Sequence, residues 1–306
     1  MGGMITAEKV GKRYTATRAL DGFDLHVPKG TVCGLLGPNG AGKTTAVKIL
    51  ATLTRHDEGT ATVNGFDVAK QAQQVKASIG LLGQHAAVDE VLSARQNMVM
   101  FGKLFHLGAR EAGRRADELL SRFDLADTGT KSVSDFSGGM RRRLDLAASL
   151  IRNPPVLFLD EPTTGLDPRG RNEVWQAIRA LTRDGTTVLL TTQYLEEADE
   201  LADSIELIDG GRVVAEGTPT QLKARVGTER LEVTVRRPDD LAKAASILRG
   251  SEVDDAQRRL RAEGGMAELV RAAQEFQEAG IEVEDIGLRR PTLDEVFLSF
   301  TGRGQK

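Results

Sequence analysis

The chain has little of what marks secreted or membrane-spanning proteins. It holds one cysteine, Cys33, among 306 residues, so no disulfide can form within it and a reducing cytoplasm is the expected compartment. Apolar runs such as residues 156–159 and 188–190 are far shorter than the roughly 20 residues that cross a bilayer. The N-terminal residues lack a basic region followed by an apolar stretch, so we expect no secretory signal and no membrane-spanning segment.

An excess of charge of one sign is also missing. Lys and Arg number 41 against 44 Asp and Glu, which leaves a net charge of −3. Proteins that bind the phosphate backbone of nucleic acids are usually basic, so we expect no nucleic-acid partner. The length is sufficient for one large domain and one small domain, each with its own core.

Glycine, by contrast, is plentiful, and its most informative cluster lies between a predicted strand and a predicted helix. The cluster consists of Gly37, Pro38, Asn39, Gly40, Ala41, Gly42, Lys43, Thr44 and Thr45. An apolar run at 31–36 predicts a buried strand before it, and apolar spacing after it predicts a helix that begins at Lys43. Glycines let successive backbone N–H groups turn toward one point, to which the helix adds its positive end. We therefore predict a phosphate-binding loop rather than an ordinary glycine-rich turn, with Lys43 reaching the β- and γ-phosphates and the Thr44 hydroxyl ligating Mg²⁺.

Polar side chains follow three further predicted strands. Gln84 follows the apolar run 79–83, Asp160 and Glu161 follow the run 156–159, and Gln193 follows the run 186–191. In a parallel α/β sheet the carboxyl ends of the strands meet at one edge, where ligands bind. At this distance from Lys43, Asp160 fits the acid that holds Mg²⁺ and Glu161 the acid that orients water in a nucleotide hydrolase. Taken alone, acids commonly just end strands, and a glutamine there is usually a solvated turn residue.

Other segments allow two interpretations. Tyr14 could stack on an adenine ring, although a lone aromatic residue is more often part of a core. Ser137-Gly138-Gly139 opens a predicted helix, where it could be a second anion site or only an N-cap with glycine spacers. The arginines at 141–143 would normally form a solvated face, but in a first helical turn they oppose the helix dipole and hint at a negative group nearby. Residues 165–168 predict a tight turn that contains Asp167.

The order of the predicted elements divides the chain in two. Residues 1–225 alternate strands and helices in an α/β pattern, with a helical stretch at about 87–152 that we expect to be an inserted subdomain. Residues 226–306 form a small α+β domain without a catalytic constellation, ending in a helix with a capping box of Thr292 and Glu295.

The ordered motifs resemble those of the ATP-binding-cassette (ABC) ATPases. They are the loop 37–45, Gln84, Ser137-Gly138-Gly139, Asp160-Glu161, Asp167 and Gln193. Three further stretches are similar to the daunorubicin/doxorubicin-resistance type ATP-binding subunits of bacterial drug exporters. These stretches are FSGGMRRRLDLA at 136–147, TTQYLEEAD at 191–199 and PTLDEVFL at 291–298. The resemblance covers essentially the whole chain, and it implies a P-loop ABC ATPase domain with a mixed sheet and an inserted helical subdomain.

The resemblance also implies how these motifs act. Tyr14 would stack on the adenine of ATP, residues 37–45 would bind its phosphates, and Gln84 would touch Mg²⁺ and relay the nucleotide state to membrane subunits. Ser137 and Gly139 would bind the γ-phosphate held by a second copy, which implies a homodimer with two composite sites. Integral membrane transporter subunits would then be the other partners, and the chain would lie peripherally on the cytoplasmic face of the cell membrane.

The implied function is ATP hydrolysis that energises the efflux of a hydrophobic drug or antibiotic. Its catalytic residues would be Lys43, Glu161 and Gln193, and Gly138 and Asp167 would complete the nucleotide-binding set. A lipid or glycan exporter remains the main alternative. A non-transport cassette ATPase would carry two cassettes or a long coiled coil, and a simple P-loop kinase would have no use for a Ser-Gly-Gly segment.

The chain departs from the usual family pattern at three positions. Phe136 and Met140 replace the Leu and Gln that flank the Ser-Gly-Gly centre in most of the superfamily, and Gln193 stands where a histidine is usual. Glutamine can still donate a hydrogen bond to a phosphate. It cannot carry charge or shuttle a proton, so we expect Gln193 to act as a neutral donor.

Overall fold

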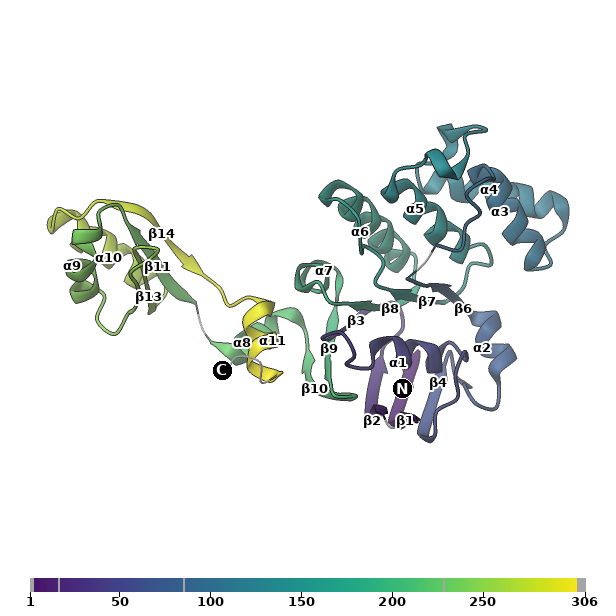
Figure 1. Cartoon of the computed structure of the whole chain (residues 1–306), viewed down its shortest axis with the longest axis horizontal. Coiled ribbons are helices and arrows are strands. Elements are labelled where there is room, and N and C mark those ends of the chain that lie inside the picture. The colour runs from purple at the N-terminus through teal and green to yellow at the C-terminus, as the bar shows by residue number, and fades with distance from the viewer. Residues whose placement is uncertain (1–2, 16, 85, 228, 302–306) are drawn as a thin grey trace. The chain divides into compact units, whose positions relative to one another are not determined.

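Figure 1 shows the computed structural model of the chain, which describes residues 3–15, 17–84, 86–227 and 229–301. The chain divides into two compact units, Met1–Pro219 and Thr220–Lys306. Each unit is described by itself below. Within the described residues, no helix combines the length and the apolar character that a bilayer crossing requires.

The larger unit contains a six-stranded sheet with the strand order β10-β9-β3-β8-β7-β6. The strands are β3 (Val32–Leu36), β6 (Ile79–Leu82), β7 (Val156–Asp160), β8 (Thr187–Thr192), β9 (Ser204–Asp209) and β10 (Arg212–Gly217). All neighbouring pairs are parallel except β9 and β10, which form an antiparallel hairpin around Gly210-Gly211. The sheet is therefore mixed, as predicted.

The other sheet of this unit is antiparallel, with the strand order β2-β1-β4-β5. Its strands are β1 (Ile5–Tyr14), β2 (Thr17–Val27), β4 (Glu58–Val63) and β5 (Phe66–Asp67). One apolar core joins this sheet, helix α1 (Lys43–Leu50) and one face of the six-stranded sheet, to which Leu35 and Phe158 contribute. Because strand side chains alternate, the neighbouring residues Leu157 and Leu159 belong to a different core on the opposite face.

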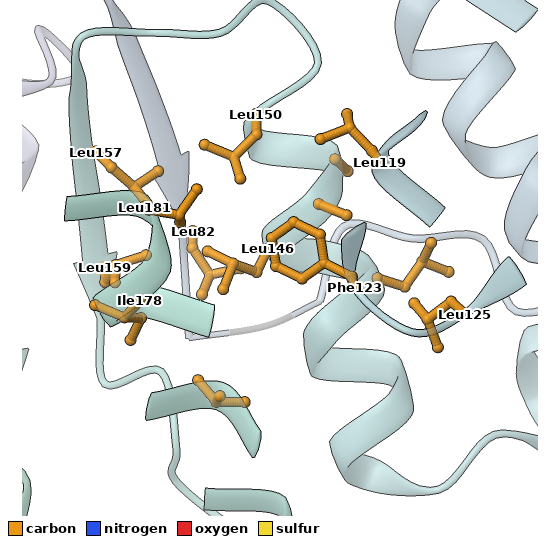
Figure 2. Close-up of a cluster of buried hydrophobic side chains, with 14 of the residues drawn as sticks. Leu82, Leu119, Phe123, Leu125, Leu146, Leu150, Leu157, Leu159, Ile178 and Leu181 are labelled. Atoms are coloured by element: carbon orange, nitrogen blue, oxygen red, sulfur yellow. The ribbon is translucent and has the colours of Figure 1, made fainter. Parts of the chain in front are cut away.

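Most helices of this unit cover that opposite face, but α2 (Ala72–Ser78) contributes Val75 to the first core. The helices of the larger unit besides α1 are α2 (Ala72–Ser78), α3 (Ala94–Leu104), α4 (Ala109–Arg122), α5 (Gly138–Ser149), α6 (Pro168–Arg183) and α7 (Leu195–Leu201), and α8 (Pro219–Val226) begins at its boundary. Figure 2 shows how Leu157 and Leu159 of the sheet, Leu146 of α5, and Leu119 of α4 form one continuous cluster of buried side chains. The helical segment therefore shares a core with the sheet through α5.

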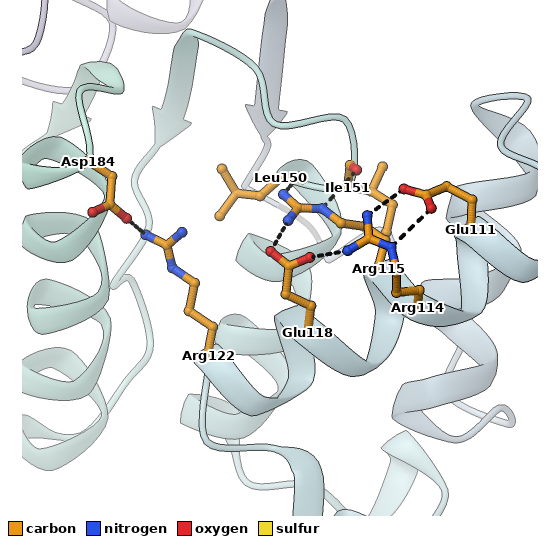
Figure 3. A network of polar contacts seen from close by, with 8 residues as sticks. All are labelled: Glu111, Arg114, Arg115, Glu118, Arg122, Leu150, Ile151 and Asp184. Atoms are coloured by element: carbon orange, nitrogen blue, oxygen red, sulfur yellow. Dashed lines mark hydrogen bonds and ion pairs between the residues drawn. The ribbon is translucent and has the colours of Figure 1, made fainter.

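Arginines of α4 add polar links to the same arrangement (Figure 3). Arg115 donates to the carbonyl oxygens of Leu150 at 2.9 Å and Ile151 at 3.2 Å, which follow the last turn of α5. The last carbonyls of a helix lack partners within the helix, so Arg115 acts as a cap. Arg122 forms an ion pair with Asp184, the residue after α6. Helix α4 is thus tied to the ends of α5 and α6.

The smaller unit is an α+β fold with the element order β-α-β-β-α-β followed by a last helix. Its elements are β11 (Arg230–Val235), α9 (Leu241–Ile247), β12 (Glu252–Asp254), β13 (Arg259–Glu263), α10 (Met266–Glu278), β14 (Val283–Arg289) and α11 (Leu293–Phe300). The sheet is antiparallel in the order β12-β13-β11-β14. Phe276 and Val233 lie in its core. The predicted capping box is present, since Thr292 and Glu295 each accept a hydrogen bond from the other's backbone N–H group.

Candidate functional site

The loop between β3 and α1 surrounds the ammonium group of Lys43. Its Nζ donates to the carbonyl oxygens of Gly37 at 2.7 Å and Pro38 at 3.1 Å, and the residue is only 5% exposed. Burial lowers the pKa of Lys43, an effect that the nearby carboxylates of Glu161 and Asp160 oppose. The lysine charge is therefore held on the inner side of the loop, facing two acids.

Glycines are required for this loop conformation. Gly40 and Gly42 have φ angles of 84° and 113°, in the left-handed region that disfavours other residues. A Cβ atom on Gly37 would lie 2.3 Å from the carbonyl oxygen of Ile208, and one on Gly42 would lie 2.5 Å from that of Ala19. Helix α1 starts directly after Gly42, as predicted, so the positive end of its dipole lies at the loop.

Three oxygen-bearing side chains meet beside the loop. Oδ1 of Asp160 accepts hydrogen bonds from Thr191 Oγ1 at 2.5 Å and from Thr44 Oγ1 at 3.5 Å, and Asp160 is 5% exposed. A carboxylate and a hydroxyl are hard ligands of the kind Mg²⁺ takes, with phosphate and water oxygens completing its shell. Across the part of the chain that the structure describes, no group of three or more His, Cys, Asp or Glu side chains could hold a metal ion alone. Thr44 and Asp160 would supply two oxygen ligands to such an ion.

Glu161 follows Asp160 in a strained conformation. Its φ angle of 50° is unusual for a residue with a side chain and costs about 1–3 kcal/mol. The backbone N–H group donates to the carbonyl oxygen of Thr191 at 3.1 Å, and the Thr164 hydroxyl donates to Oε2 of the carboxylate at 3.2 Å. The strand β7 ends at Asp160, and the Thr164 hydroxyl holds the carboxylate of the residue that follows it.

The other predicted residues of this edge are exposed. Gln84 follows the end of β6 and Gln193 follows the end of β8, next to Glu161 at the end of β7 in the strand order. Tyr14, the last residue of β1, is 42% exposed, so the interpretation of Tyr14 as a core residue is wrong. The centroid of the Tyr14 ring lies 5.5 Å from the Lys12 ammonium group. Because Tyr14 is exposed, this ring is accessible at the surface.

A pocket of about 560 Å³ lies where α5 and α6 begin. Ser137 caps α5 by accepting a hydrogen bond from the Met140 N–H group at 3.2 Å, and Asp167 caps α6 by accepting one from Gly170 at 2.7 Å. The two helix starts are close together, because a Cβ atom on Gly139 would lie 3.2 Å from the Cα atom of Gly170. The N-cap interpretation of Ser137 is therefore correct. It leaves the anion interpretation open, since two helix N-termini share one pocket.

The expectation of a solvated arginine face is wrong for Arg142. This residue is 9% exposed and donates to the carbonyl oxygen of Glu161 at 3.1 Å. A second buried polar group, Glu197 on α7, accepts hydrogen bonds from Thr163 at 2.8 Å and from the indole Nε1 of Trp175 at 3.1 Å. For Arg142 the sequence carried one signal, the hint that the arginines at 141–143 face a negative group. It carried none for Glu197.

Fold and site together define a P-loop nucleotide-binding protein with a helical segment packed on a mixed sheet. A family model described as "ABC transporter" matches residues 20–164, and one described as "ATP-binding protein DrrA1-3-like, C-terminal domain" matches residues 217–301. The chain belongs to the ATP-binding proteins of ABC transporters. The predicted family resemblance and fold class are confirmed.

Individual relatives match nearly the whole chain. The chain is 60% identical over 302 residues to "Daunorubicin resistance ATP-binding protein DrrA3" of Streptomyces coeruleorubidus, covering 97% of this chain and 96% of that protein. It is 47% identical to "Daunorubicin/doxorubicin resistance ATP-binding protein DrrA" of Streptomyces peucetius, covering 95% of this chain and 90% of that protein. A solved dimeric structure of a post-hydrolysis ATP-binding cassette bound to ADP and Pi is similar in fold, with a TM-score of 0.63, 25% identity, and coverage of 70% of this chain and 98% of that chain.

Proposed function

We propose that the chain is the ATP-binding and ATP-hydrolysing subunit of an exporter that removes a hydrophobic drug or antibiotic through separate membrane subunits. The observation that carries the proposal is the meeting of Lys43, Thr44, Asp160 and Glu161 at one edge of the sheet. A buried ammonium group, two oxygen ligands that suit Mg²⁺ and a second carboxylate beside them are the parts that phosphoryl transfer to water requires.

Each residue has a distinct task in this proposal. Lys43 and the loop amides bind the phosphates of ATP, while Thr44, Asp160 and Gln84 hold Mg²⁺. Mg²⁺ held there would stabilise negative charge on phosphate oxygens. Glu161 orients the attacking water. Gln193 donates a hydrogen bond to the γ-phosphate, and Tyr14 stacks on the adenine.

We further propose that two copies complete each other's sites. The pocket at Ser137, Gly138, Gly139 and Asp167 joins two helix N-termini but is not lined by Lys43. Two helix N-termini suit the γ-phosphate of a nucleotide held by a second copy. The similar cassette solved as a dimer with ADP and Pi supports this assembly.

The transport role is supported by relatives named for drug resistance, at 60% and 47% identity. In the proposal the protein binds membrane subunits at the cytoplasmic face of the cell membrane. The C-terminal unit, Thr220–Lys306, acts there as an accessory domain for interaction, because the residues that the structure describes in it form an apolar core and an ion-paired surface rather than a phosphate-binding loop.

Phosphate release from ATP by the purified chain tests the hydrolytic part of this proposal. Glu161→Gln should keep ATP affinity and slow hydrolysis by at least about a hundredfold, because it keeps the shape but removes the carboxylate. The matched control is Glu200→Gln, which alters an exposed carboxylate on α7 and should keep the wild-type rate. Wild-type turnover by Glu161→Gln would contradict the assignment.

Drug accumulation in cells tests the transport part separately. Cells that co-express the chain with its membrane subunits should accumulate less of a fluorescent anthracycline than cells with Glu161→Gln. Equal accumulation, with ATP hydrolysis intact in vitro, would contradict drug export and favour a lipid or glycan substrate.

A further inference from the structure

Arg142 on α5 uses every N–H group of its guanidinium inside the protein. Nε donates to the carbonyl oxygen of Pro162 at 2.6 Å, and Nη2 donates to those of Asp160 at 3.3 Å and Glu161 at 3.1 Å. Nη1 donates to the carbonyl oxygen of Gly83 at 2.9 Å and faces Oδ2 of Asp145 at 3.5 Å. An arginine has five N–H groups, so none is left for a phosphate.

Three of these contacts are to consecutive residues at the end of β7, from Asp160 to Pro162. The peptide group that precedes Glu161 is also held by β8, because the N–H group of Glu161 donates to Thr191. The carbonyl group of Glu161, which belongs to the next peptide, accepts a hydrogen bond from Arg142. Both peptide groups of this left-handed residue are therefore fixed, and only the side-chain torsions remain free to move the carboxylate.

Asp145 completes the arrangement one turn further along α5. It is 4% exposed and lies at hydrogen-bond distance from Arg142, so it neutralises the buried guanidinium. Its other oxygen accepts a hydrogen bond from the Ala87 N–H group at 3.0 Å. Arg142 and Asp145 thus hold the backbone on either side of Gln84, through Gly83 and Ala87.

We infer that Arg142, paired with Asp145, is a positioning residue for hydrolysis: it fixes the peptide of Glu161 and ties that peptide to the backbone beside Gln84. The inference rests on the proposed function, in which Glu161 orients the attacking water. Arg142 touches neither ATP nor water in this role. A lysine cannot replace it, because one ammonium group cannot reach carbonyl oxygens on two separate segments at once.

The test compares Arg142→Lys with a matched control on the same helix. Arg141→Lys alters a neighbouring arginine that pairs with the exposed Glu90 at 3.0 Å, and it should hydrolyse ATP like the wild type. Arg142→Lys should lower kcat by about ten- to a hundredfold, while KM and the Kd for ATP stay within about threefold. Wild-type kcat in Arg142→Lys would overturn the inference.

A double-mutant cycle separates positioning from general damage. In single-turnover hydrolysis, adding Arg142→Lys to Glu161→Gln should cause almost no further loss, because the carboxylate it positions is already gone. A loss by the same factor in both backgrounds would overturn the inference. A wild-type chain that does not hydrolyse ATP would instead contradict the proposed function itself, which is a separate result.

A milder substitution covers the case in which Arg142→Lys does not fold. Asp145→Asn keeps an acceptor for the Ala87 N–H group but removes the negative charge that holds the guanidinium of Arg142 against its carbonyl partners. It should lower kcat by about two- to tenfold, again only when Glu161 is present. An effect of equal size in the Glu161→Gln background would contradict the inference.

Discussion

Trp175 on α6 donates a hydrogen bond from its indole Nε1 to Oε1 of Glu197 on α7, at 3.1 Å. The same oxygen accepts a hydrogen bond from the Thr163 hydroxyl at 2.8 Å. Both partners are buried, and Trp175 is the only tryptophan of the chain. Helix α7 begins two residues after Gln193, which we propose donates a hydrogen bond to the γ-phosphate. The fluorescence of Trp175 therefore reports on the helix that follows this residue.

Substitutions of Glu197 should separate loss of an acceptor from loss of a charge. Glu197→Ala leaves two buried donors without a partner, so it should lower the free energy of unfolding by about 2–4 kcal/mol. Burial raises the pKa of Glu197, so its charge is costly to bury, and Glu197→Gln should cost less than about 1 kcal/mol. Urea unfolding followed by Trp175 fluorescence measures both, with the exposed Glu196→Ala as control. Equal losses for the Ala and Gln variants would contradict this account.

Gln193 should act as a neutral hydrogen-bond donor. Gln193→Ala should lower ATP turnover by roughly ten- to a thousandfold with a much smaller change in ATP affinity, as loss of one transition-state donor does. Gln193→His should stay active and gain an acidic limb, because histidine titrates near pH 6.5. The measurement is the ATPase rate against pH at saturating Mg-ATP, with the exposed Gln73→Ala as control. An unimpaired Gln193→Ala would mean that this residue only ends its strand.

Mixing two inactive variants should reveal a composite site. Ser137→Arg should abolish hydrolysis without weakening ATP binding to one copy, and Lys43→Ala should be inactive because it loses the phosphate contact. An equal mixture should recover about a quarter of wild-type activity, since half of the randomly formed dimers hold one intact site of two. Ser121→Arg, at an exposed position of α4, is the control for the added charge. No recovery, once subunit exchange is demonstrated, would count against the composite site.

Glu206 on β9 should make stability depend on pH. Burial, together with the carboxylate of Glu216 opposite it on β10, raises the pKa of Glu206 to about 8. The unfolded chain loses this proton near pH 4.5, so between there and pH 8 the folded state becomes less stable by about 1.4 kcal/mol per pH unit. The stabilisation by Glu206→Gln should therefore grow from pH 5 to pH 8, measured by urea unfolding.

A matched variant identifies the cause of that pH dependence. Glu216→Gln removes a neighbouring charge from an exposed position, so it should lower the pKa of Glu206 and reduce the slope. A difference between Glu206→Gln and wild type that does not change with pH would show that Glu206 is ionised in the folded protein.

Contiguous motifs could be predicted well because their information is local. The glycines at 37, 40 and 42 meet steric and φ requirements within one loop, and Lys43 begins the helix that follows. The capping box of Thr292 and Glu295 lies within one turn. By contrast, β12 and β13 escaped prediction, because they are short, rich in charged residues, and stabilised by pairing with other strands.

The sequence by itself determined the family, the mixed α/β class and the residue types that phosphate chemistry needs. Only the tertiary structure decided which of them touch. Thr44 and Asp160 are 116 positions apart, and they meet because β3 and β7 flank β8 in a strand order that local periodicity does not encode. Arg142 was missed for a related reason. Its partners are mainly backbone carbonyl oxygens, which every residue carries, so a guanidinium that gathers them from separate segments leaves no pattern of side chains in the sequence.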